Sequence, residues 1–273
     1  FWARDEFACP SGRICTPPLM GVGQSLEDVY HQQKVRLGHG GFGEVWRGVH
    51  RKTNEVVAVK QIDKLKSFVW QGLKRADVQR EIDVMNAVRH ENVLRLHQVF
   101  EDNRFVSLAL EYCDGGDLDD KLKQRGYQVE ENEAQAATKQ ICSAVAALYA
   151  KRICHRDIKP GNFLLSRNVL KLADFGCSVF LFGDDLLSEQ CGTPSFMAPE
   201  EHLIGQGSKG YSFPVDVWAV GIVLYMLISG GQHPFSTTRG DLDKKALVKG
   251  DFAFGGFFLK ELVGWSAPRF SEG

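Results

Sequence analysis

The alternation of apolar and polar residues predicts strands in the first part of the chain. Between Val35 and Ile62 the segments EVWRGVH and EVVAVKQ alternate apolar and polar positions and are rich in valine. A period of two residues is typical of half-buried strands. Strand-like segments return in LRLHQVF and FVSLALEY, so we expect a sheet built before about residue 112.

A helical period interrupts these strands once and then dominates the rest of the chain. Apolar residues recur at spacings of three or four between Lys74 and Arg89, and again in AQAATKQICSAVAALYA at 134–150. This is the spacing of one face of a helix. The apolar segment Val217–Ile228 is too short to span a bilayer and predicts a buried core helix.

The order of these elements predicts the fold class. Strands come first, helices follow, and the join lies near EYCDGGD. Segregated strands and helices indicate an α+β fold, and a cleft between the two parts is the natural place for a ligand.

Composition narrows the class of protein. The chain has 273 residues, with 44% hydrophobic and 25% charged, which is ordinary for a globular protein with one large domain or two lobes. The formal net charge of -1 gives no overall attraction to nucleic acid or anionic membranes, so we expect neither as a partner. Seven scattered cysteines without a CxxC pair favour reduced thiols over a disulfide framework or a zinc site. With no membrane span, they favour a cytoplasmic location.

A glycine-rich segment, LGHGGFGEV at 37–45, predicts a phosphate-binding loop. Gly38, Gly40 and Gly43 form G-x-G-x-x-G, and glycines let backbone N–H groups approach phosphate oxygens. A dinucleotide-binding motif needs a helix directly afterwards. The following GEVWRGVH is strand-like instead. We therefore expect a glycine-tipped hairpin lying over a nucleotide, and a plain turn is the alternative.

The next strand carries a candidate phosphate ligand. In VAVK at 57–60, Ala58 and Lys60 share one face because side chains alternate along a strand. The small apolar residue could cover a purine while the lysine reaches its phosphates. Glu81, on the predicted helix, could pair with Lys60. The alternatives are a surface lysine on an edge strand and a solvated helix charge.

The segment HRDIKPGN at 155–162 has the residues for moving a phosphoryl group to a hydroxyl. Asp157 can orient the hydroxyl and accept its proton, and Lys159 can neutralise charge on the phosphoryl group. Asn162 and Asp174, in the later ADFG, offer oxygen ligands to Mg²⁺. Phosphoryl transfer requires mainly positioning and charge neutralisation, so this set predicts it.

Six segments together carry a family resemblance. The glycine loop, VAVK, HRDIKPGN, DFG, APE at 198–200 and DVWAVG at 216–221 occur in the order found in eukaryotic protein kinases. The chain resembles that family over roughly residues 30–270, and within it the serine/threonine type, most nearly the calcium- and calmodulin-dependent group. Lys159 and Thr193 carry the resemblance to the serine/threonine type.

The resemblance implies a bilobal domain that uses ATP and Mg²⁺. It implies a tail or linker at 1–29 and a kinase domain at 30–273, with its C-terminal end possibly truncated. The N-lobe would be 30–110, the hinge 111–114 and the C-lobe 115–273. The implied catalytic residues are Asp157, Lys159, Lys60, Glu81 and Thr193, and the implied metal ligands are Asn162 and Asp174. The implied nucleotide-binding residues are Leu37, Gly38, His39, Gly40, Gly41, Phe42, Gly43, Val45, Ala58, Lys60, Leu110, Glu111, Cys113, Asp117 and Leu164.

The resemblance also implies a buried regulatory framework. Asp216 would brace the catalytic loop, and Arg269 would pair with Glu200. Glu189 falls where many relatives carry an activating phosphothreonine, so we hypothesise that it mimics the phosphate toward Arg156. Ser188 is the competing phosphosite, and a solvated loop charge is the alternative for Glu189.

The implied function is transfer of the γ-phosphoryl of Mg-ATP to Ser/Thr hydroxyls of protein substrates. The alternative is a pseudokinase that acts as a nucleotide-binding scaffold. No EF-hand loop and no basic amphipathic helix after the domain are present. Any calcium-sensing module would therefore lie outside this chain.

Overall fold

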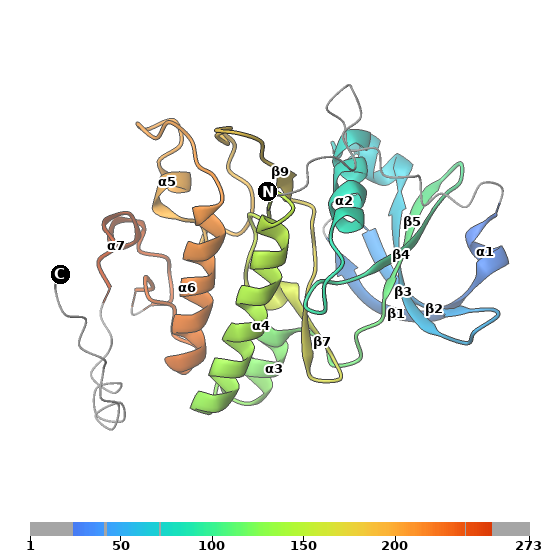
Figure 1. Ribbon diagram of the computed structural model, residues 1–273, viewed down its shortest axis with the longest axis horizontal. Coiled ribbons are helices and arrows are strands. Elements are labelled where there is room, and N and C mark those ends of the chain that lie inside the picture. Colours follow the sequence, from blue (N-terminus) through green and yellow to red (C-terminus); the bar gives the residue numbers. More distant parts are fainter. Residues whose placement is uncertain (1–23, 41–42, 71, 238, 253–273) are drawn as a thin grey trace, which may run out of the picture.

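The computed structural model describes residues 24–40, 43–70, 72–237 and 239–252, in which a sheet-rich lobe is followed by a helical lobe (Figure 1). This confirms the α+β class that the segregated periods predict. No helix in these ranges is long and apolar enough to cross a membrane.

The first lobe is built on a five-stranded antiparallel sheet in the order β1-β2-β3-β5-β4. VAVK lies on β3, which is hydrogen-bonded to β2 on one side and β5 on the other. It is therefore an interior strand, and the edge-strand alternative is wrong. The strands are β1 (Tyr30–Gly40), β2 (Gly43–His50), β3 (Val56–Asp63), β4 (Leu96–Glu101) and β5 (Phe105–Glu111).

One face of this sheet gathers the residues predicted to meet a nucleotide. In the strand register Lys60 lies opposite Val45 and Leu108, and Ala58 lies opposite Leu110. Directly paired residues share a face, as do residues two apart on a strand. Val45, Ala58, Lys60 and Leu110 therefore face the same way.

The opposite face is covered by a short helix that the sequence analysis assigned to the tail. Helix α1 (Leu26–Val29) has Ser25 as N-cap, and Asp28 completes a capping box. Leu26 and Tyr30 are buried with Val57 and other apolar residues of this face. Residues 25–29, assigned to the tail from the sequence, thus pack against the first lobe.

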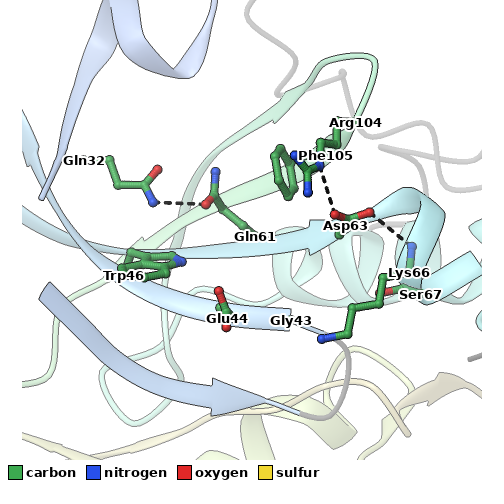
Figure 2. Close-up of a pocket in the computed structure, with 10 residues that line it drawn as sticks. All are labelled: Gln32, Gly43, Glu44, Trp46, Gln61, Asp63, Lys66, Ser67, Arg104 and Phe105. Carbon is green, nitrogen blue, oxygen red and sulfur yellow. Dashed lines mark hydrogen bonds and ion pairs between the residues drawn. The ribbon is translucent and has the colours of Figure 1, made fainter. Parts of the chain in front are cut away.

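A pocket of about 380 Å³ also opens on this opposite face. Trp46 and Gln61 line it, together with residues of the π-helix η1 (Leu65–Trp70). Figure 2 shows Gln32 donating to Gln61 at 3.0 Å, and Arg104 bonded to Asp63. Because Gln61 and Lys60 are neighbours on β3, they face opposite ways. This pocket is therefore separate from the nucleotide face.

Helix α2 (Arg75–Ala87) joins the first lobe to the second. Its residues Val78, Ile82 and Met85 are buried, which confirms the helix predicted between Lys74 and Arg89. These side chains belong to an apolar cluster that continues into the helical lobe. The helix is therefore held to both lobes by burial of its apolar face.

The helical lobe is centred on α4 (Glu131–Tyr149) and α6 (Pro214–Ile228), which lie side by side in Figure 1 and contact each other. Both predicted helices are confirmed, and each starts three residues earlier than expected. Pro214 occupies the first turn of α6, where its missing N–H costs nothing. The other elements are α3 (Leu118–Gln124), β6 (Ile153–Cys154), η2 (Pro160–Asn162), β7 (Phe163–Ser166), β8 (Val169–Leu172), β9 (Val179–Phe180), α5 (Pro199–His202) and α7 (Lys244–Lys249).

Candidate active site

A buried carboxylate on α6 anchors the backbone of the loop between β6 and η2. Asp216 on α6 is 1% exposed and accepts the backbone N–H groups of His155 at 2.7 Å and Arg156 at 2.8 Å. Burial raises the pKa of Asp216, and the two N–H donors oppose that shift. The brace implied for Asp216 is confirmed. It supports the backbone of Arg156, whose φ is 66°.

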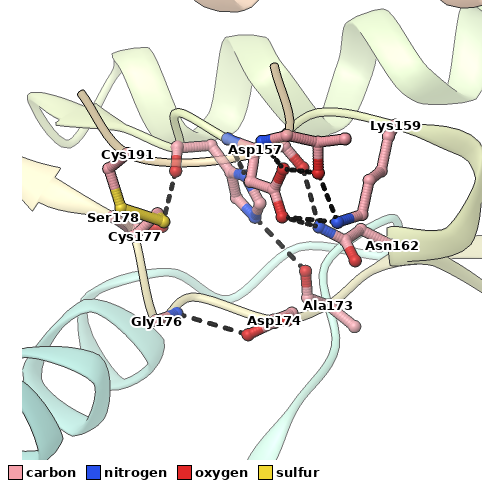
Figure 3. A network of polar contacts seen from close by, with 11 residues as sticks. Asp157, Lys159, Asn162, Ala173, Asp174, Gly176, Cys177, Ser178 and Cys191 are labelled. Carbon is pink, nitrogen blue, oxygen red and sulfur yellow. Dashed lines mark hydrogen bonds and ion pairs between the residues drawn. A yellow bond between two sulfur atoms is a disulfide. The ribbon is translucent and has the colours of Figure 1, made fainter. Parts of the chain in front are cut away.

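Asp157 is the centre of a hydrogen-bond network (Figure 3). Its Oδ2 accepts from Lys159 Nζ at 2.8 Å and from Asn162 Nδ2 at 3.0 Å. Its Oδ1 accepts from the N–H of Thr193 at 2.9 Å and from its hydroxyl at 2.8 Å. Lys159 also donates to the Thr193 hydroxyl at 2.7 Å. The structure therefore joins four of the predicted site residues around one carboxylate.

These contacts keep Asp157 ionised. Burial alone would raise its pKa, but the hydrogen bonds from Lys159, Thr193 and Asn162 and the charge of Lys159 outweigh burial and lower it. The carboxylate is therefore charged at neutral pH, which is the state in which a carboxylate can accept a proton.

Gly192 permits this network, and the sequence analysis did not single it out. Its φ is +111°, and a Cβ at this position would lie 2.2 Å from the carbonyl oxygen of Arg156. Only glycine fits such a close backbone approach. The approach brings Thr193, the next residue, within reach of Asp157. The sequence signal that could have indicated this requirement is a single glycine directly before Thr193 and Pro194.

Lys60 and Glu81 form the ion pair that the sequence analysis proposed. Lys60 Nζ lies 2.6 Å from Glu81 Oε1, and both side chains are nearly buried, at 11% and 6% exposure. Burial lowers the pKa of Lys60, but Glu81 and Asp174 together raise it above its usual value. The solvated-charge alternative for Glu81 is therefore wrong, and Lys60 is a fixed cation on the face predicted to meet a nucleotide.

Asn162 and Asp174 present oxygen atoms suited to a divalent cation. Asn162 uses its Nδ2 to donate to Asp157, which turns its Oδ1 away from that residue. The N–H of Ala173 donates to the Asn162 carbonyl at 2.8 Å. This bond places Asp174, the next residue in the chain, close to Asn162. Asp174 is exposed, and its backbone φ is 60°. An amide oxygen and a carboxylate fit Mg²⁺, which takes its remaining oxygen ligands from water and phosphates.

Phe175 packs beneath these residues. It is 1% exposed, and its ring lies 5.2 Å from that of His155 in an edge-to-face contact. Met85 and Leu96 are buried in the same apolar cluster. Phe175, Met85 and Leu96 are therefore packed in one core, and His155 contacts it through the ring of Phe175.

The glycine segment serves two different needs. A Cβ at Gly38 would meet nothing within 4 Å, which leaves open space beside β1. A Cβ at Gly43 would lie 2.3 Å from the carbonyl oxygen of Gln61, so this glycine is required by the close approach of β3. The backbone of His39 and Gly40 continues β1 opposite β2. Gly41 and Phe42 lie outside the described residues.

The predicted hinge lies at the end of β5. Leu110 is buried, and the Glu111 N–H donates to the Arg95 carbonyl at 2.9 Å. Burial raises the pKa of the Cys113 thiol to about 12, so it is a neutral thiol.

Two more predicted residues meet on the C-lobe side of the hinge. Asp117 forms an isolated antiparallel bridge with Leu164. Asp117 also caps α3, since its Oδ1 accepts the N–H of Asp120 at 2.8 Å. Leu37, at the start of the glycine segment, is 38% exposed.

The structure contradicts the hypothesis that Glu189 mimics a phosphate. The Glu189 side chain is exposed, and within the described ranges it makes no ion pair with Arg156. The guanidinium of Arg156 instead donates to the carbonyl of Cys177 at 2.6 Å and to the hydroxyl of Tyr211 at 3.3 Å.

Glu201, the residue after Glu200, carries a buried carboxylate beside the activation segment, which we define as residues 177–191. It is 2% exposed, and its Oε2 accepts the N–H of Ala198 at 2.8 Å. Burial raises its pKa to about 7. Arg269, the partner implied for Glu200, lies outside the described residues.

A disulfide joins Cys177 to Cys191, which corrects the expectation that the cysteines are reduced. Figure 3 shows this bond beside the Asp157 network. It closes the activation segment at its two ends, directly after DFG and directly before Gly192. Two cysteines 14 residues apart carry no sequence signal for pairing, because the fold alone brings them together.

Reducing this disulfide is expected to expose the activation segment to protease. Cross-linking a loop of this length contributes about 3 kcal/mol in the chain-entropy model. Phe182 and Leu186 are 51% and 54% exposed, so chymotrypsin can test the loop directly. Cleavage at these residues should be several-fold faster with reductant. A Cys191→Ser variant should be cleaved equally fast with and without reductant, and an unchanged rate in the parent would contradict the expectation.

Comparisons with known proteins agree with this geometry. A family model described as protein kinase domain matches residues 30–254. A probable myosin light chain kinase from Dictyostelium discoideum is 35% identical over 81% of this chain and 56% of its own length. Calcium-dependent protein kinase 5 of Plasmodium falciparum is 36% identical over 84% of this chain and 39% of its own. A serine/threonine-protein kinase SIK3 homolog of Danio rerio is 38% identical over 85% and 19%. The chain thus spans about half or less of the length of these relatives.

Proposed function

This chain belongs to the protein kinase family, in its serine/threonine group, and we propose that it transfers the γ-phosphoryl of Mg-ATP to Ser/Thr hydroxyls of protein substrates. The observation that carries the proposal is the Asp157 carboxylate bound by Lys159, Asn162 and Thr193. The kinase domain would occupy residues 30–273, with 111–114 as the hinge between its lobes.

Asp157 is proposed to act on the acceptor hydroxyl. Its carboxylate orients the hydroxyl and takes its proton as the oxygen bonds to phosphorus. Lys159 lies 2.8 Å from that carboxylate, so its ammonium stands where negative charge accumulates on the transferred group. Thr193 keeps both side chains in place through its hydroxyl.

Lys60 is proposed to hold the nucleotide phosphates. Glu81 fixes its ammonium on the sheet face that also carries Val45, Ala58 and Leu110. Val45 and Ala58 would cover one face of a purine, Leu164 of the second lobe would cover the other, and Leu110 would lie beside the ring. Asn162 and Asp174 would hold Mg²⁺, which when bound neutralises phosphate charge.

The test is phosphate transfer from radiolabelled ATP to a Ser/Thr peptide library, with a tyrosine-only library as control. The purified chain is assayed with Mg²⁺ and a calcium chelator, and again with excess EDTA. We expect label on the Ser/Thr library only, and its loss with EDTA. A folded chain that binds ATP but labels no peptide would contradict the proposal and favour a nucleotide-binding scaffold. Label only after calcium and a calcium sensor are added would indicate control from outside this chain.

A further inference from the structure

The guanidinium of Arg156 donates its hydrogen bonds to neutral groups rather than to an acid. It is nearly buried, at 9% exposure, and donates to the Cys177 carbonyl and the Tyr211 hydroxyl. In the described part of the chain no carboxylate lies within ion-pair distance of it, and the buried Glu201 carboxylate acts on it only from further away. A buried cation needs hydrogen-bond acceptors, and Tyr211 supplies one from outside the activation segment.

The same Tyr211 hydroxyl holds the activation segment. It donates to the backbone carbonyl of Glu189 at 2.5 Å. One hydroxyl therefore accepts from Arg156 in the catalytic loop and donates to the segment three residues before Gly192. A hydrogen bond with one charged partner is stronger than a neutral pair.

Tyr211 is itself held firmly in place. It is 2% exposed and packs with Leu181 and Val215. Its backbone pairs with Leu187 in both directions, at 2.8 and 3.0 Å. Gly210 makes this pairing possible, because its φ is +125° and a Cβ there would lie 2.8 Å from the Leu187 carbonyl oxygen.

We propose that Tyr211 is a positioning residue whose hydroxyl keeps the activation segment assembled on Arg156 without a phosphate on that segment. Only a few residues connect the Tyr211 hydroxyl to the Asp157 network. Glu189 leads to Gly192 and then to Thr193, which binds Asp157. The inference rests on the proposed transfer activity, which it extends to the regulation of the same site.

The test compares Tyr211→Phe with Tyr149→Phe. Both variants remove only a hydroxyl that donates to a backbone carbonyl, but the Tyr149 hydroxyl donates to Phe213, which lies outside residues 187–193. A reductant is present so that the Cys177–Cys191 bond does not mask the effect. Tyr211→Phe should lower kcat about tenfold, equivalent to about 1.4 kcal/mol, with the KM for ATP unchanged. Tyr149→Phe should leave kcat close to that of the parent.

Hydrogen exchange provides a readout that does not depend on activity. Peptides covering residues 187–193 should exchange about tenfold faster in Tyr211→Phe and at the parental rate in Tyr149→Phe, if opening follows the lost bond. Equal exchange in both variants would overturn the proposal, even if the parent transfers no phosphate. An active parent that phosphatase treatment silences would also overturn it. A parent without transfer activity but with the predicted exchange would contradict only the proposed function.

Discussion

Asp157→Ala is expected to lower phosphate transfer by about 10²- to 10⁴-fold, the usual contribution of a positioned general base. The carboxylate is ionised at neutral pH because its hydrogen bonds to Lys159 and Thr193 lower its pKa despite burial. Its charge would be lost only when the pH falls through that lowered pKa. The measurement is kcat on the best-labelled peptide, taken beside the unfolding midpoint of each variant.

Two further variants separate chemistry from folding for Asp157. Asp157→Asn keeps an oxygen to accept from Thr193 but has no carboxylate to take a proton, so it should be nearly as inactive. Asp184→Ala removes an exposed acid from the activation segment and should retain full activity. If Asp157→Ala kept more than about a tenth of parental kcat, Asp157 would not be a general base.

Lys60→Met is expected to lower both activity and stability. Loss of a fixed cation facing the phosphates should reduce kcat/KM by about 10²- to 10³-fold. The substitution also leaves Glu81, 6% exposed, without its counter-ion. Removing one partner of a buried ion pair typically costs about 3 to 5 kcal/mol in the free energy of unfolding. Peptide kinetics and urea unfolding measure the two effects.

The double variant Lys60→Met/Glu81→Leu tests whether these effects are separable. Replacing both charges with apolar side chains should recover most of the lost stability, because no unpaired charge remains. It should not recover activity, because the phosphates still lack their cation. Lys74→Met, an exposed lysine before α2, is the control and should behave like the parent. A stable double variant with parental kcat/KM would show that Lys60 does not act on the phosphates.

Local patterns predicted this protein best where the interacting residues are close in sequence. Asp157, Lys159 and Asn162 lie within six residues of one another, and the structure joins them in one hydrogen-bond network. Periodicity likewise predicted α2, α4 and α6, because burial of one helix face repeats every few residues. Their first residues were missed by no more than three, since capping residues rather than the period set helix ends.

The errors arose where distant segments meet. The pairing of Cys177 with Cys191 and the exposure of Glu189 depend on how the activation segment folds back. The close approach of β3 to Gly43 was likewise not predicted, because Gln61 lies on a different strand. Tyr211 gave no signal, because its role depends on Arg156, 55 residues away.

The sequence by itself therefore determined the α+β class, the order of the elements and the residue types for phosphoryl transfer. These follow from short-range periodicity and from side-chain chemistry within single segments. Tertiary structure alone decided that Lys60 is paired with Glu81, that Thr193 reaches Asp157, and that Tyr211 rather than Glu189 bonds Arg156. Such contacts result from packing between segments far apart in the chain, and no local pattern encodes them.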